Sequence, residues 1–131
     1  MVRPGASAYQ KTSVESASRE EILLKLFEGG IRFLRYARES WKKGEKARAR
    51  DFRSKAMAII TELHATLDRE KGDKELVRQL EELYAFMIKE MVRIGVEDDF
   101  DALKDIEEIM QKLYDGFKDA ATQLRKQNLG K

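Results

Sequence analysis

Apolar residues recur three and four positions apart along four long stretches of the chain, which places them on one face of a helix. The spacing predicts amphipathic helices at about residues 19–43, 45–71, 74–94 and 101–127. The connections between them are short and contain glycine, so consecutive helices must run in opposite directions. The predicted fold is therefore all-α, an antiparallel up-down-up-down four-helix bundle.

The N-terminal segment has a different pattern. Residues 1–17 show no apolar periodicity and carry a Pro-Gly pair, several serines and alanines, and one aromatic residue, Tyr9. We predict a flexible lead over residues 1–17 ahead of a bundle domain over residues 18–127. Ser18 and Glu21 form a capping box, in which each side chain accepts from the backbone N–H of the other residue. The first helix is therefore expected to begin directly after Ser18.

Two glycines fall in the middle of the first predicted helix, Gly29 and Gly30. Each costs about 1 kcal/mol of helix stability relative to alanine. Their presence predicts a close approach of another backbone, or of a bound segment, at this point. Gly44 and Gly72 follow the first and second helices, and Gly95 is expected to end the third. Asp73 is a predicted N-cap for the third helix.

Composition limits the class of protein. The chain has 131 residues, of which 42% are hydrophobic and 38% charged, and it contains no cysteine. The hydrophobic content is enough for one core, and the charged content indicates long solvated helix faces. Without cysteine the chain can form no disulfide and has no thiol chemistry. No apolar run is long enough to span a membrane, and the start of the chain has no apolar signal-peptide region. We expect a cytoplasmic protein without membrane insertion.

The sequence offers little for catalysis or metal binding. A di-iron bundle needs a Glu-x-x-His pair on each of two helices, and His64 is the sole histidine. The acidic run that begins at Asp99 fails as a calcium loop, because Lys104 and Met110 occupy the glycine and glutamate positions. No nucleophile, base and orienting group can be assembled. We expect a protein that is not an enzyme and that has no cofactor, metal or small-molecule substrate. A small enzyme or a ligand-binding bundle is the alternative.

Charge is distributed unevenly although the net charge is only +2. Residues 35–55 carry nine cationic and three anionic side chains, whereas residues 97–108 are acidic. The basic corner could meet an acidic partner or nucleic acid, but it lacks a base-reading motif and aromatic interleaving. A solvated face is the favoured interpretation, and no nucleic-acid partner is expected.

Apolar side chains exceed what a narrow bundle seam requires. Several lie beside the core stripes, and methionine and tyrosine among them suit an adaptable groove for another chain. A wide core with scattered surface hydrophobes is the equal alternative. The predicted partner-binding residues are Tyr9, Met57, Tyr84, Phe86, Ile88 and Ile109.

The first third of the chain resembles the FliS family of flagellar export chaperones. That family opens with an Ala-Tyr-Gln-Lys-Thr-like lead and a capped helix that reads Leu-x-x-Leu-Tyr-x-Gly-x-Ile-Arg-Phe-Leu. This chain has Ala8-Tyr9-Gln10-Lys11-Thr12 and then Leu23-Leu24-Lys25-Leu26-Phe27-Glu28-Gly29-Gly30-Ile31-Arg32-Phe33-Leu34. Further likeness lies in Glu62-Leu63, Leu67-Asp68 and Leu83-Tyr84-Ala85-Phe86-Met87. Two residues depart from the family: Phe27 stands in place of a tyrosine, and Phe117 stands near a common tryptophan.

The resemblance implies a cytoplasmic secretion chaperone that binds the disordered C-terminal segment of flagellin. It would prevent premature polymerisation and deliver the subunit for export, with components of the export gate as candidate further partners. A helical adaptor for another secreted or signalling protein is the alternative. Tyr9 is predicted either to anchor the lead in an apolar site until the client displaces it or to contact the client itself.

Overall fold

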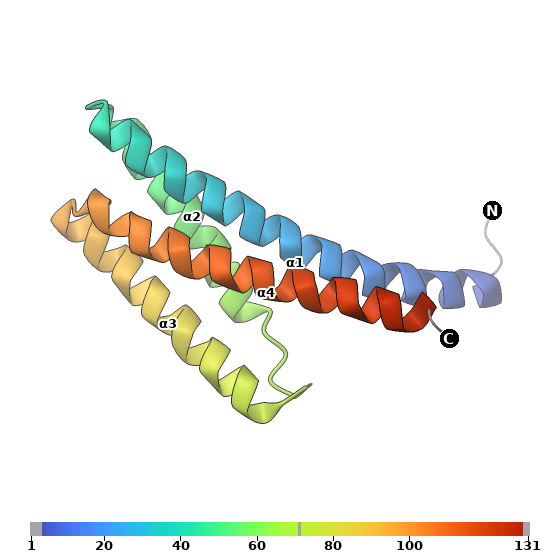
Figure 1. Ribbon diagram of the computed structural model, residues 1–131. Coiled ribbons are helices and arrows are strands. Elements are labelled where there is room, and N and C mark those ends of the chain that lie inside the picture. The colour runs from blue at the N-terminus through green and yellow to red at the C-terminus, as the bar shows by residue number, and fades with distance from the viewer. Residues whose placement is uncertain (1–3, 71, 130–131) are drawn as a thin grey trace.

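The computed structural model describes residues 4–70 and 72–129, with side chains described for residues 19–70, 72–124, 126 and 127. These residues form four α-helices and one short 3₁₀-helix, η1, without any strand (Figure 1). The all-α four-helix bundle is therefore confirmed. The elements are α1 (Pro4–Lys42), α2 (Lys46–Ala65), α3 (Lys74–Glu97), η1 (Phe100–Ala102) and α4 (Leu103–Leu129).

The helices follow one another around a single core. α1 packs closely on both α2 and α4, whereas α3 packs mainly on α2 and only slightly on α4. Figure 1 shows α1 and α4 continuing side by side beyond the ends of α2 and α3. The core consists of fully buried aliphatic, methionine and aromatic side chains that come from all four helices and η1. Its largest members are Tyr84, Phe27, Phe100, Leu34, Ile60 and Leu63.

The first helix begins at Pro4, so the predicted start at the Ser18 capping box is wrong. Residues 4–17, predicted as a flexible lead, are helical. Proline is favoured at the first helical position because its φ is already helical and its missing N–H needs no partner there. After Gly5 the segment contains neither glycine nor proline, so nothing interrupts the helix before residue 18. The domain boundary at residue 18 stays a prediction.

The second helix ends earlier than predicted, at Ala65 rather than near residue 71. The Thr66 hydroxyl donates to the Glu62 carbonyl oxygen at 2.9 Å, and the Thr66 N–H donates to the same oxygen. The Asp68 carboxylate then accepts from the Glu70 N–H at 3.0 Å, which turns the chain away from the helix axis. Local side-chain hydrogen bonds thus replace the last turns of the predicted helix.

The third helix continues past Gly95 to Glu97, and Asp98 ends it with a left-handed φ of 54°. Gly95 has a packing role instead. A Cβ at this position would lie 2.6 Å from the guanidinium carbon of Arg53, which crosses from α2. Arg53 uses the space to donate to the Met91 carbonyl oxygen at 3.0 Å. The predicted N-cap of this helix is confirmed, since Asp73 accepts from the Glu75 N–H.

Gly29 and Gly30 lie where α1 meets its two neighbours. A Cβ on Gly30 would stand 2.8 Å from Met110 Cε of α4 and 3.3 Å from Ile59 Cγ2 of α2, whereas a Cβ on Gly29 would meet only Ile59 Cδ1, at 3.4 Å. The predicted close approach exists, but the neighbours are side chains and not a backbone. Gly30 therefore allows Met110 and Ile59 to fill the core beneath α1.

An aromatic stack and several hydrogen bonds stabilise the end of the bundle that contains the α1–α2 and α3–α4 turns. Trp41 stacks on the buried Phe100 of η1, with ring centroids 4.2 Å apart and planes 2° from parallel. Arg93 donates hydrogen bonds to Glu90, Glu97 and Asp99, which raises the pKa of its guanidinium. At the opposite end, among the residues that the structure describes, α2 and α3 stop short of the ends of α1 and α4 (Figure 1).

Candidate partner-binding surface

Unequal helix lengths leave part of α1 and α4 without cover. Ile59 of α2 lies against Gly29 and Gly30, and α2 ends six residues later, at Ala65. In an antiparallel pair this end is level with about Leu24 of α1. The part of α1 before Leu23 therefore extends beyond α2. Figure 1 shows that only α4 accompanies it there.

An apolar groove lies in this uncovered region, between α1 and α4. Its volume is about 170 Å³. One glutamate lines it; the other lining side chains are aliphatic or aromatic. We call it the overhang groove, and it is lined by Glu20, Leu23, Leu24, Phe117, Ala120, Ala121 and Leu124. Leu124 is 52% exposed, which is unusual for a leucine in a regular apolar stripe.

One of the two residues that depart from the family pattern lines the overhang groove, and the other lies buried against it. Phe117 lines the groove and packs on the buried Phe27, with ring centroids 5.6 Å apart. A tyrosine or a tryptophan here would bring a polar tip that needs a hydrogen-bond partner. Phenylalanine has no polar atom in its side chain, so neither Phe27 nor Phe117 needs such a partner. The two residues that differ from the family pattern thus contact each other.

Four predicted partner-binding residues do not line the overhang groove. Met57, Ile88 and Ile109 are partly buried and pack against the core, and Met57 also accepts a weak hydrogen bond from Arg53. Phe86 is 51% exposed on α3. These four side chains come from three helices and do not gather at one site in the overhang groove. Their role in binding a partner stays a prediction.

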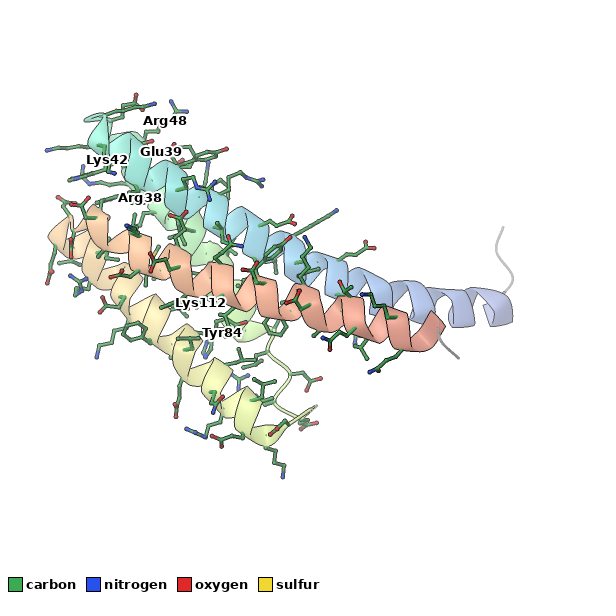
Figure 2. All side chains as sticks on the ribbon, in the orientation of Figure 1. Arg38, Glu39, Lys42, Arg48, Tyr84 and Lys112 are labelled. Atoms are coloured by element: carbon green, nitrogen blue, oxygen red, sulfur yellow. The ribbon has the colours of Figure 1, made fainter. Side chains whose placement is uncertain are left out.

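Tyr84 is a core residue in the structure, 2% exposed (Figure 2). It cannot contact a partner unless the helices separate. Tyr9 lies in the helical part of α1, but its side chain is outside the described residues. The two predicted roles of Tyr9 therefore stay open.

Burial raises the pKa of Tyr84 from its ordinary value of 10 to about 12. Between these values the unfolded chain loses the phenolic proton while the folded chain keeps it, so stability falls as pH rises from 10 to 12. At pH 11 we expect this tyrosine to lower the free energy of unfolding by about 1 kcal/mol. Urea unfolding of the wild type and Tyr84→Phe at pH 8 and 11 measures the difference. An equal pH dependence of both proteins would contradict the buried environment of Tyr84.

Polar contacts between α1 and α4 hold these two helices in register. The Tyr114 hydroxyl donates to the Glu28 carboxylate at 2.7 Å, which raises the pKa of Tyr114. Arg35 and Arg38 of α1 both donate to Glu107 of α4, at 3.2 and 2.8 Å. Arg38 and Glu107 are largely buried, so their contact is worth more than an exposed ion pair. These bonds join α1 to α4, the two helices whose extensions form the overhang groove.

The described residues contain no cluster of His, Cys, Asp and Glu suited to a metal ion, and His64 is half-buried. None of the described helices is long and apolar enough to cross a lipid bilayer.

Comparison with known proteins agrees with the sequence pattern. A sequence model of the family "Flagellar protein FliS" matches residues 2–124, which is nearly the whole chain. The chain belongs to the FliS family. The flagellar secretion chaperone FliS of Bacillus subtilis is 30% identical over 124 residues, with 95% of this chain and 91% of the relative covered. FliS of Salmonella typhimurium is 33% identical, with 87% of each chain covered. FliS of Escherichia coli is 29% identical, with 88% of each covered.

Membership of the FliS family confirms the resemblance noted in the N-terminal third of the chain. The family match extends over both walls of the overhang groove, since it includes residues 20–24 of α1 and 117–124 of α4. Leu23, Phe117 and Leu124 belong to the regular apolar stripes of α1 and α4, and a stripe by itself does not indicate a binding surface. The missing information was the early end of α2, which no apolar spacing revealed.

Proposed function

We propose that this FliS-family protein is a cytoplasmic secretion chaperone that binds the disordered C-terminal segment of flagellin. It would prevent premature polymerisation of flagellin and deliver the subunit to the export apparatus, whose gate components are candidate further partners. The observation that carries the proposal is the overhang groove. It is an apolar surface between α1 and α4 that no other described part of the chain covers. The names of the similar proteins support the same assignment.

The groove has the right properties for a helical or extended apolar segment. Its walls are two antiparallel helices, so its floor is a continuous row of small and large apolar side chains. An amphipathic client helix could place residues at i, i+3, i+4 and i+7 along this row. The small residues Ala120 and Ala121 allow a backbone to approach, while Leu24 and Leu124 provide contact area at the sides.

The energetics fit a chaperone that must release its client. A disordered segment that folds on binding costs about 2–5 kcal/mol or more in ordering, which offsets part of a large contact area. Polymerisation or export can then compete for the segment. Phe117 lines the groove and packs on Phe27, and neither side chain has a hydroxyl group. Burial of a client against Phe117 therefore depends on apolar contact and shape.

A binding experiment with two forms of flagellin tests the proposal. Full-length flagellin should bind the purified protein in isothermal titration calorimetry with a negative heat-capacity change, which reports apolar burial. Flagellin without its C-terminal segment should not bind measurably. Equal binding of both forms would refute the proposed client segment. Absence of binding by either form would favour the alternative, a helical adaptor for another secreted or signalling protein.

A further inference from the structure

The outer face of α1 borders two hollows that are separate from the overhang groove. Tyr36 is 40% exposed and stands between two hollows. The first, about 390 Å³, lies between α1 and α2 and is lined by Tyr36, Phe52 and polar residues. The second, about 260 Å³, lies between α1 and α4 and is lined by Tyr36, Tyr114 and two arginines. We call this surface the Tyr36 face.

Aromatic contacts preorganise the Tyr36 face. The Tyr36 ring lies 5.3 Å from the Phe52 ring, which also stacks on Phe33 at 6.0 Å. The cations of Arg48 and Lys55 lie 5.6 and 5.7 Å from the Phe52 centroid. A ring that is fixed by its neighbours loses little conformational entropy when a partner binds. Tyrosine and arginine are also the residue types that dominate binding energy at protein interfaces.

The second hollow has a cation available for a partner. Among the residues whose side chains the structure describes, Arg32 has no carboxylate within salt-bridge distance. Arg35, on the same wall, shares Glu107 with Arg38 and keeps half of its side chain exposed. The one acidic side chain in this hollow, Glu28, is already engaged by the Tyr114 hydroxyl at 2.7 Å. A carboxylate could therefore enter without displacing an existing ion pair.

The first hollow combines an aromatic wall with charged side chains of both signs. Glu39 and Glu45 line it beside Tyr36 and Phe52, and so do Lys43 and Arg48. The charges balance, so the hollow offers no excess of positive charge to the phosphates of nucleic acid or anionic lipid, whereas its aromatic wall can take an apolar group. Figure 2 shows Glu39 and Arg48 near the α1–α2 end of the bundle, where cationic side chains predominate. An acidic peptide fits both hollows. It can place an apolar side chain in the first hollow and its carboxylates over the arginines of the second.

We propose that the Tyr36 face docks an acidic segment of a second protein, which seats an aromatic or branched apolar side chain against Tyr36 and Phe52 and places carboxylates on Arg32 and Arg35. The occupant is defined by charge complementarity with the basic stretch of residues 35–55, which has nine cationic and three anionic side chains. This surface lies outside the overhang groove, so a client and this partner can bind together.

Fluorescence anisotropy with short labelled peptides tests the proposal. The probes are a pool of acidic peptides with one central aromatic residue, the same pool with amides in place of carboxylates, and the same pool with alanine in place of the aromatic residue. The acidic aromatic pool should bind at least about tenfold more tightly than either control pool. Its affinity should weaken as salt rises, since the carboxylate contacts are exposed.

Variants locate the binding. Tyr36→Ala and Arg32→Glu should each weaken the acidic aromatic pool about tenfold or more, whereas two matched controls on α3, Phe86→Ala and Lys89→Glu, should not. Circular dichroism verifies that all four remain folded. The proposal is overturned if the acidic pool does not exceed its controls, or if the Tyr36 and Arg32 variants bind as the wild type does. Preferential binding of single-stranded DNA or phosphatidylserine vesicles at these residues would overturn it too. Unchanged flagellin binding by both variants is expected and separates this surface from the client groove.

Discussion

Leu124→Asp is expected to weaken flagellin binding at least about tenfold and to leave the melting temperature of the free protein nearly unchanged. Leu124 is 52% exposed in the free protein, so an aspartate there remains hydrated until a client arrives. In the complex the same carboxylate would be buried against an apolar segment without a partner, which is costly. Calorimetric titration of flagellin into wild type and variant measures the loss.

Three further aspartate variants show whether the effect of Leu124→Asp on binding is specific to the overhang groove. Val96→Asp places the same charge on α3 at a valine that is 80% exposed and outside the overhang groove, and it should not affect binding. Leu63→Asp, at a core position 2% exposed, should unfold the bundle instead. Phe86→Asp tests whether the exposed aromatic residue on α3 also contacts the client. If Val96→Asp weakens binding as much as Leu124→Asp does, the client does not occupy the overhang groove.

The adjacent glycines in α1 are expected to respond to substitution in opposite directions. Gly29→Ala should raise the free energy of unfolding by about 0.5–1 kcal/mol, because alanine is the better helix former. Its Cβ would meet only Ile59 Cδ1, at an ordinary contact distance of 3.4 Å. Gly30→Val should lower the free energy of unfolding by about 3 kcal/mol, because its side chain would overlap Met110 and Ile59. Urea unfolding followed by circular dichroism measures both.

A double-mutant cycle identifies the cause at Gly30. In a Met110→Ala background, which removes the nearest atom, the cost of Gly30→Val should fall by about 1 kcal/mol or more. The cost of a distant change such as Leu76→Ala should not depend on this background, since Leu76 is half exposed at the far end of α3. An undiminished cost of Gly30→Val in the Met110→Ala protein would show that the contact with Met110 of α4 is not responsible.

Much of the architecture was predictable from the chain itself. Apolar spacing is a local property, and it correctly indicated four helices and their inner stripes, including Leu63, Met87 and Met110. The turns at Gly44 and Gly72 were predictable because a positive φ favours glycine, and both residues have one, 79° and 82°. The cap at Asp73 followed from the hydrogen-bonding chemistry of aspartate.

Helix ends were less predictable where several local signals compete. The capping box at Ser18 is a valid start signal, yet α1 continues through it to Pro4. Gly95 looks like a stop signal, but its lack of a side chain serves Arg53 of another helix. Such a contact joins residues far apart in the chain, so no window of sequence contains it.

Local pattern by itself determined the fold class, the number of helices and the membership of most core positions, because each depends on residues within a few turns of one another. Only the tertiary structure decided which apolar residues remain uncovered. Leu124 and Leu63 both belong to a regular inner stripe. Leu63 is 2% exposed in the core, whereas Leu124 is 52% exposed on the part of α4 that extends past the end of α2. Burial depends on the neighbour that a stripe meets in space, and that neighbour is set by the relative lengths and register of four helices.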